Sequence, residues 1–335
     1  MNKLRLFLFP DTGIEEEACI RACVLELQKS FSIEEVRVGR REKGFFKKNK
    51  SSELSWIVSK DWQGALDYLA AFSAKSKIFV SVLSNQSRKL SLWETWYQSL
   101  HRVIPANIKL LAHSPLSYRF LKELAGMPDL QLEQLPFPVP TPSFGKKQSA
   151  FTVGAYGSFV PNNNLHFLLT VGHYLAKKDR TIQLKLWGQG PLSQHLVQLA
   201  RDLGLEEQVH IIPSSSSSPP EFCDVSLYFP HRNDHFGSLL MAASVGAVPI
   251  CGKIPGIERY VTDSVNGFVF DSEETRSIAE LILSLKNHPY LCQQMGAQFK
   301  KDVFKNFSIE RVSEQYLSLM NGNVYQIRNY IRHAI

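Results

Sequence analysis

The residues whose types could do chemistry lie in a polar loop between a predicted strand and a predicted helix. Alternation over residues 224–230 predicts the strand, and the run rich in Leu, Met and Ala over 238–245 predicts the helix. The loop 231–235 reads His-Arg-Asn-Asp-His and carries a carboxylate at Asp234, and Phe236 and Gly237 open the apolar run that follows. A helix start offers unpaired N–H groups and a partial positive charge, which suit a phosphate, and Gly237 lets a ligand approach the backbone.

The elements that must position this loop are a strand, a helix and a second strand. Gly246 is expected to end the helix, and residues 247–251 are expected to form the next strand. Open α/β sheets bind ligands at the carboxyl ends of their strands, which is where loop 231–235 lies. The alternative is an ordinary buried helix of a doubly wound domain, in which Gly237 serves packing alone. The residues by themselves favour that alternative.

Strand and helix patterns alternate along the whole chain, which predicts an α/β fold built from doubly wound domains. In the first half, strands are expected at 4–9, 35–38, 54–58, 78–83 and 108–112, and helices at 14–30, 61–74, 91–103 and 115–124. In the second half, further strands are expected at 151–156, 182–187 and 209–212, and helices at 163–177, 192–203, 273–286, 290–304 and 308–320.

A proline-rich stretch separates the two halves. Residues 136–143 contain four prolines, and the short polar run 145–149 follows them. Proline at this density makes a semi-rigid spacer. We therefore expect an N-terminal domain over 1–145, a C-terminal domain over 146–320 and a basic helical tail over 321–335.

Composition limits the classes of protein. With 335 residues, 44% of them hydrophobic and 21% charged, the chain is expected to be a soluble globular protein of two domains. No apolar run approaches the roughly 20 residues of a membrane helix, and the run 4–9 is too short for a signal peptide. The five cysteines form no closely spaced framework, so a cytoplasmic location is expected. No Asp-x-Asp pair or histidine cluster points to a metal ion, and no cofactor is expected.

The excess positive charge lies in the N-terminal half. The net charge is +7, with 22 Lys and Arg against 15 Asp and Glu in residues 1–150, and 16 of each in residues 151–335. Much of the excess falls in residues 37–50, around Phe45 and Phe46. This pattern suits an anionic membrane surface, and a solvated surface loop is the alternative. Nucleic acid is not expected as a partner, because no recognised binding module accompanies the charge.

Several short motifs, taken in order, resemble those of family-4 glycosyltransferases of the GT-B fold. They are residues 230–237, 246–249, 255–258 and 266–269, the Gly-x-Gly-Pro turn at 188–191, Leu-Gly-Leu at 203–205 and the turn at 156–163. Each motif is weak alone, but their order and spacing over residues 110–320 are strong evidence for the fold. In that family an acidic residue precedes the Phe-Gly pair, and Asp234 stands at that position.

The resemblance implies a retaining glycosyltransferase with two doubly wound, Rossmann-like domains that face each other across a cleft. It implies a nucleotide-sugar donor on the C-terminal domain and a glycan or lipid-linked acceptor on the N-terminal domain. The donor-binding residues that it indicates are Gly157, Ser158, Asn163, Gly188, Gly190, Arg232, Phe236, Gly237 and Ser238. Because many relatives use lipid-linked acceptors, a peripheral position on the inner membrane face is a second expectation for location.

Two residues are candidates for catalysis. Asp234 is one, from its place in the motif. His113 is the other, because it follows the predicted strand 108–112 at the ligand-binding edge, where the family commonly has Ser. A lone histidine is more often structural than catalytic, so a structural role for His113 stays open.

Three positions depart from the family's pattern. The family has an Arg and a Lys that bind the donor diphosphate where this chain has Ser158 and Asn163, and a Glu where it has Ala242. Hydrogen bonds to charged groups contribute roughly 1.5–3 kcal/mol each, so losing both cations weakens donor binding. Three other cations could substitute: Arg232, Lys253 and Arg259. The alternative function is therefore a catalytically inactive relative that binds a glycan or a protein partner.

Overall fold

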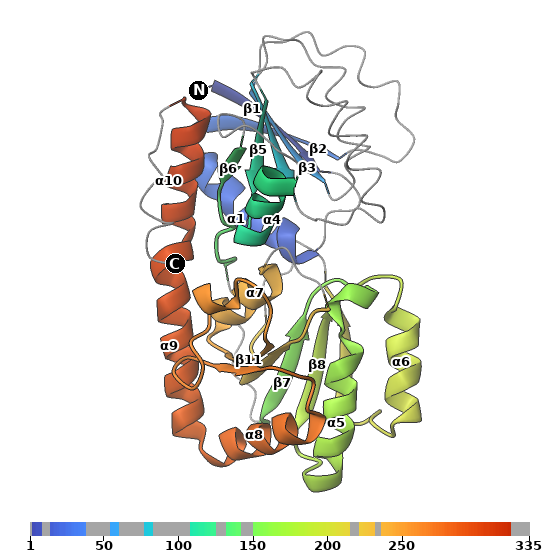
Figure 1. Cartoon of the computed structure of the whole chain (residues 1–335). Helices are drawn as coiled ribbons and strands as arrows, with labels where there is room; N and C mark the ends of the chain where they lie inside the picture. Colours follow the sequence, from blue (N-terminus) through green and yellow to red (C-terminus); the bar gives the residue numbers. More distant parts are fainter. Residues whose placement is uncertain are drawn as a thin grey trace.

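The computed structural model describes residues 2–8, 14–37, 54–59, 77–82, 108–124, 132–141, 150–214, 221–231 and 236–322. Several expectations lie outside these residues: the helices at 61–74 and 91–103, most of the basic stretch 37–50, the domain boundary near 145 and nearly all of the tail 321–335. Within the described residues the chain forms two parallel six-stranded sheets, one above the other, with helices around them (Figure 1).

The first sheet has the strand order β2-β1-β3-β4-β5-β6, and each neighbouring pair is parallel. Its strands are β1 (Asn2–Leu8), β2 (Phe31–Arg37), β3 (Leu54–Ser59), β4 (Ile78–Val82), β5 (Ile108–Ala112) and β6 (Leu132–Gln134). Its described helices are α1 (Ile14–Leu27), α4 (Pro115–Arg119) and the π-helical turn η2 (Phe120–Leu124). Strands β3, β4 and β5 are nearly continuous apolar runs, as expected of parallel strands that are covered on both faces.

The second sheet has the order β12-β11-β10-β7-β8-β9 and is also parallel throughout. Its strands are β7 (Thr152–Tyr156), β8 (Gln183–Gly188), β9 (Val209–Pro213), β10 (Val225–Tyr228), β11 (Val248–Gly252) and β12 (Phe268–Phe270). The short helices are η4 (Pro161–Asn163) and η5 (Ile257–Arg259), and the longer ones are α5 (His166–Lys178), α6 (Ser193–Asp202), α7 (Gly237–Val245), α8 (Thr275–Asn287), α9 (Pro289–Phe307) and α10 (Ile309–Met320).

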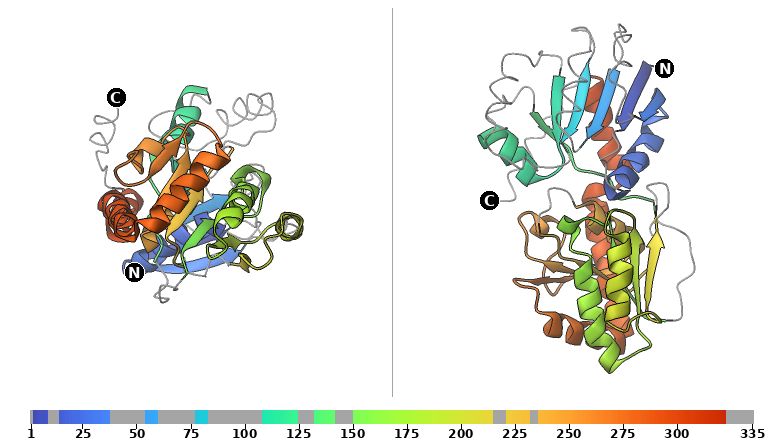
Figure 2. Two further views of the ribbon diagram at one scale, coloured as in Figure 1. Left: turned by 90° about the horizontal axis from the view of Figure 1, so that it is seen from below. Right: turned by 90° about the vertical axis from the view of Figure 1, so that its right-hand side faces the viewer.

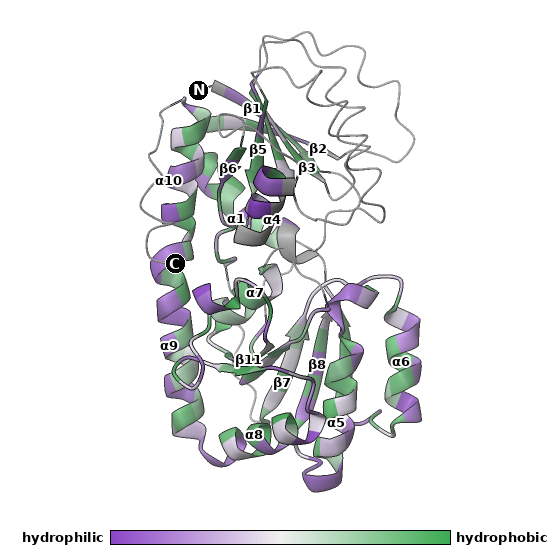
Figure 3. Ribbon diagram, viewed as in Figure 1, coloured by the Kyte–Doolittle hydropathy of each residue, from purple (hydrophilic) through white to green (hydrophobic). Residues whose placement is uncertain are grey.

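The two sheets confirm the predicted α/β class. The short strands β6 and β12 were not predicted, because three residues are too few to show a strand period. Helices α9 and α10 mix hydrophilic and hydrophobic residues along their length (Figure 3), as amphipathic helices with one buried side do. In α9 the buried residues recur every three or four positions: Cys292, Met295, Gly296, Phe299, Val303 and Phe307.

Helices α9 and α10 run along one side of both sheets (Figures 1 and 2). The Val139 N–H, in the segment after β6, donates to the Phe307 carbonyl at 2.7 Å. From α10, the Tyr316 ring lies 5.0 Å from the Trp56 ring of β3, centroid to centroid. The Ser313 hydroxyl lies 3.6 Å from the Cys23 sulfur of α1. The end of the described chain therefore packs against the first sheet and its helix, and one buried cluster spans both halves.

All five cysteines are free and buried. Burial raises the pKa of Cys23 and that of Cys223 to about 12, so neither is a thiolate near neutral pH. No helix in the described part of the chain is both long enough and apolar enough to cross a membrane.

Candidate functional site

The strand order of the second sheet reverses between β7 and β10. The chain places β8 and β9 on one side of β7, and β10, β11 and β12 on the other. In an open parallel sheet such a switch point creates a crevice at the carboxyl ends of the strands. Residues 157–164 after β7 and residues 229–231 after β10 flank this point. The predicted donor-binding residues Gly157, Ser158 and Asn163 lie in the first of these segments.

The turn after β7 packs backbone to backbone against the turn after β8. The Phe159 N–H donates to the Gln189 carbonyl at 2.9 Å. A Cβ added at Gly188 would lie 1.8 Å from the Gly157 carbonyl oxygen, and one at Gly190 would lie 2.6 Å from the Phe159 carbonyl oxygen. Neither turn has room for a side chain at these positions. The structure thus brings together Gly157, Gly188 and Gly190.

A cavity of about 430 Å³ opens beside these turns. Its walls come from the turns after β7 and β8, from α6 and from β9, and its polar lining includes Gln189, Ser193, Gln194, Gln198 and Arg201. Apolar walls with a few amide and hydroxyl groups are typical of pockets that orient a small polar ligand. The sequence showed the turn at 188–191 as a motif but not the cavity, because the remaining walls from the turn after β7 and from β9 meet it only in the folded chain.

Side-chain and backbone hydrogen bonds hold the segment after β7 in place. The Asn163 Nδ2 group donates to the Ser158 carbonyl at 2.9 Å, and the His231 N–H donates to the Asn162 carbonyl at 2.9 Å. Asn164 has a φ of 51°, in the left-handed region that Asn adopts more readily than most residues. Ser158 and Asn163 therefore lie in an ordered turn that a hydrogen bond joins to the segment after β10.

The start of α7 is buried. Phe236 takes the N-cap position, and no side chain caps the helix with a hydrogen bond. The Phe236 ring lies 4.6 Å from the Tyr260 ring, and Gly237 and Ser238 are buried beside it. The three predicted donor-binding residues at this helix start are thus packed into the protein in this conformation.

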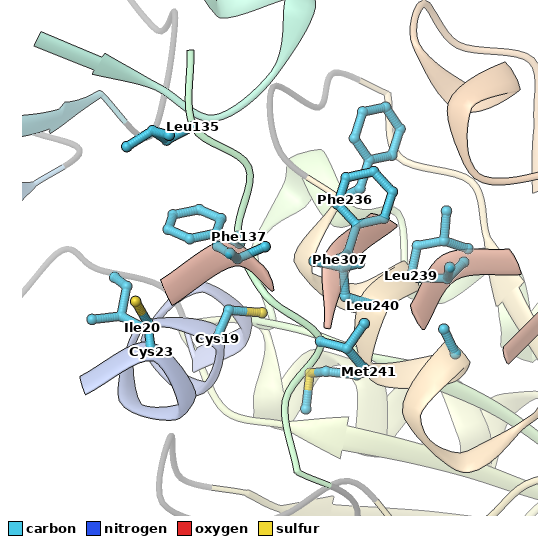
Figure 4. Packing of buried hydrophobic residues seen from close by; sticks show 14 of the residues in the cluster. Cys19, Ile20, Cys23, Leu135, Phe137, Phe236, Leu239, Leu240, Met241 and Phe307 are labelled. Carbon is cyan, nitrogen blue, oxygen red and sulfur yellow. The ribbon is translucent and has the colours of Figure 1, made fainter. Parts of the chain in front are cut away.

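Ala242, where the family has a Glu, is completely buried in α7. It belongs to the cluster that contains Cys19 and Cys23 of α1 together with Leu240 and Met241 of α7. Figure 4 shows the side chains of α1 and α7 from this cluster between the two sheets. An alanine fits such surroundings, whereas a carboxylate would lose its hydration there.

The structure places His113 in the packing between β5, the segment after β6, and α10. The side chain is 3% exposed. Its Nδ1 atom lies 2.7 Å from the Leu135 carbonyl oxygen and 3.4 Å from the Tyr316 hydroxyl. Its ring stacks on Phe137 with centroids 3.9 Å apart. A substrate would reach the ring only after this packing opens.

Two of the cations that could substitute for the missing pair, Lys253 and Arg259, lie among the described residues. Lys253 forms an exposed salt bridge of 2.8 Å with Asp271. His166 begins α5, and partial burial, followed by the neighbouring ring of His231, lowers the pKa of His166. Arg232 and Asp234 lie outside the described residues. Among the described residues, no group of three or more His, Cys, Asp or Glu could hold a metal ion.

Comparison with known proteins agrees with this architecture. Residues 141–302, which include the whole second sheet and helices α5 to α8, match the family model of Glycosyl transferases group 1. The GT-B structures that the chain resembles have the same two-sheet α/β architecture, so the fold is that of the GT-B glycosyltransferases.

Solved structures resemble nearly the whole chain. HepE of Anabaena with UDP and glucose superimposes with a TM-score of 0.68 at 14% identity, covering 94% of this chain and 99% of that one. A glycosyltransferase from Rickettsia africae gives 0.70 at 12% identity, covering 97% and 100%. A TarM variant from S. aureus, bound to fondaparinux, α-GlcNAc-glycerol and UDP, gives 0.65 at 16% identity, covering 89% and 58%.

The curated relatives match a shorter part of this chain than the solved structures do. Poly(ribitol-phosphate) α-N-acetylglucosaminyltransferase of Staphylococcus aureus is 23% identical over 181 residues, which cover 52% of this chain and 36% of that protein. N-acetyl-α-D-glucosaminyl L-malate synthase of Bacillus anthracis is 24% identical over 137 residues, 40% of this chain and 36% of that protein. The matched part thus spans about a third of either relative.

Proposed function

We propose that this chain is a retaining glycosyltransferase that transfers a sugar from a UDP-sugar to a glycan or lipid-linked acceptor. The observation that carries the proposal is the interlocked pair of glycine turns beside the cavity, of which the turn after β7 also flanks the switch point of the second sheet. UDP is the proposed nucleotide because the related structures of TarM, HepE and the pneumococcal O-GlcNAc transferase GtfA contain it. The retaining stereochemistry rests on the motif resemblance.

In this proposal the donor lies across the carboxyl ends of β7 and β8. The turns at Gly157 and Gly188 pack on each other with no side chain between them, and in this proposal their backbone approaches the diphosphate. The cavity beside Gln189 takes the nucleoside. Asp234 and His113 remain the candidate catalytic residues, and His113 can act only if the packing around it opens. No metal ion is assigned a role, so neutral donors and nearby cations meet the charge on the leaving UDP.

Nucleotide binding tests the proposal most directly. Addition of UDP or a UDP-sugar at about one hundred times its Kd is expected to stabilise the folded chain by about 2.7 kcal/mol. With an unfolding entropy of roughly 2.1 cal/mol/K per residue, this raises Tm by about 4 °C. Differential scanning fluorimetry with UDP, GDP, ADP and their sugars measures the shift. No shift with any of them would contradict donor binding.

The inactive alternative is favoured by Ser158, Asn163 and Ala242, which leave the donor without three charged contacts. An assay of sugar transfer distinguishes this inactive relative from an active enzyme. If UDP-sugar binds but is neither hydrolysed nor transferred to glycan or lipid-linked acceptors, the chain is a glycan-binding or partner-binding relative. Release of UDP that depends on the acceptor supports the enzyme.

A membrane surface is the proposed site of action, through the basic residues of 37–50. Each Lys or Arg near an anionic surface contributes about 1 kcal/mol, and salt screens the attraction. We expect the chain to co-sediment with anionic vesicles but not with neutral ones. Added salt, or replacing Lys47, Lys48 and Lys50 with Glu, should weaken this binding. Equal sedimentation with both vesicle types, or with neither, would leave the basic stretch as a solvated surface.

A further inference from the structure

Glu273, which follows β12, joins three loops at the carboxyl edge of the second sheet. Its Oε1 atom accepts a hydrogen bond of 2.6 Å from the Asn164 Nδ2 group, in the turn after β7. The same oxygen lies 3.9 Å from Nδ1 of His231, which follows β10. One exposed carboxylate thus connects the two segments that flank the switch point.

The bond to Asn164 is the stronger of these two contacts. Asn164 is 3% exposed, whereas the side chains of His231 and Glu273 are 52% and 44% exposed. An exposed ion pair contributes little, and it exists only while the histidine is protonated. The buried amide needs a partner at any pH, and among the described residues its Oδ1 atom has none. Glu273 therefore fixes the Asn164 side chain.

We propose that Glu273 is a positioning residue for the donor site, an inference that rests on the proposed function. It holds Asn164, and the next residue back, Asn163, donates to the Ser158 carbonyl at 2.9 Å. The turn whose backbone approaches the donor diphosphate is thus anchored at one end by Gln189 and at the other by Glu273. Glu273 does not touch the donor; it keeps the turn in the geometry that does.

A double-mutant cycle at pH 7.5 tests the route through Asn164. Glu273→Ala removes the acceptor, and Asn164→Gly removes the donor while suiting the φ of 51°. Each change is expected to weaken UDP binding, measured by titration calorimetry, by about tenfold, because small misplacements at a site are costly. The double variant should be no weaker than either single one. Glu273→Gln, which still accepts the hydrogen bond, should remain within about threefold of wild type.

The matched control is Glu280→Ala. Glu280 lies on α8, is exposed, and pairs with Arg276 at 2.9 Å, away from the switch point. Its loss should change the Kd for UDP by less than about twofold, since exposed pairs contribute little. In a turnover assay Glu273→Ala should raise KM for the donor more than it lowers kcat, which a general loss of folded protein would not do.

Hydrogen exchange without nucleotide separates this inference from the proposed function. Glu273→Ala should speed amide exchange in residues 157–164 and 229–231 and leave β8 and α9 unchanged. If the wild type binds UDP and the variants bind it equally well, or if the effects of the two changes add, the positioning role is wrong while the function stands. If the wild type binds no nucleotide, the proposed function and the donor role fall together. If Glu273→Ala also leaves amide exchange in residues 157–164 and 229–231 unchanged, then Glu273 does not hold these two segments either.

Discussion

Gly188→Ala is expected to weaken UDP binding severely and to destabilise the C-terminal half. The added Cβ would lie 1.8 Å from the Gly157 carbonyl oxygen and 2.8 Å from the Phe159 ring, so the turns after β7 and β8 must separate. Overpacking of this kind typically costs about 1–3 kcal/mol, and a backbone obstacle places the cost at the upper end of that range. Because those turns form the proposed donor site, the Kd for UDP should rise by at least about a hundredfold.

The control for this prediction is Gly204→Ala. Gly204 has a φ of +67°, and nothing lies within 4 Å of the added Cβ. Alanine there costs about 1–2 kcal/mol in backbone strain alone. Chemical denaturation and calorimetry should show two destabilised variants, of which only Gly188→Ala loses UDP. If Gly188→Ala binds UDP as the wild type does, the turns are not the donor site.

Ala242→Glu is expected to destabilise the protein strongly instead of restoring the family's donor contact. The position is completely buried in the cluster that joins α7 to Cys19 and Cys23 of α1. An unpaired charge in such a place costs about 3–5 kcal/mol. UDP affinity should not increase. Urea denaturation followed by circular dichroism measures the loss of stability.

The pH dependence of that loss provides a further check. Burial raises the pKa of the new carboxyl above its unfolded value, so the folded state binds its proton more tightly than the unfolded state. The destabilisation should therefore be smaller at pH 5 than at pH 8. Val265→Glu introduces the same charge at a position that is 57% exposed, and should change stability by less than about 0.5 kcal/mol. A stable Ala242→Glu that binds UDP more tightly would show that α7 faces the donor.

The sequence by itself determined the class of fold. Strand and helix patterns are local, and each parallel strand with its covering helix carries enough apolar residues to be recognised. The same pattern could not show the three-residue strands β6 and β12, whose pairing is set by their neighbours. Gly157, Gly188 and Gly190 were recognisable as parts of short motifs. The sequence did not show why these positions must be glycine.

Only the tertiary structure shows why these positions must be glycine, because the backbones of the turns after β7 and β8 come too close for a side chain. The sequence showed Ala242 only as a position where the family's carboxylate is missing. The packing of α7 against α1 shows that the surroundings of Ala242 are apolar. The sequence indicated His113 only as a residue at a strand end, and its stacking on Phe137 and its contact with Tyr316 place it in the packing between β5, the segment after β6, and α10. Glu273 had no signal at all, since 109 residues separate it from Asn164, its hydrogen-bond partner. Residue types and short spacings are local, whereas burial and long-range contacts exist only once the chain has folded.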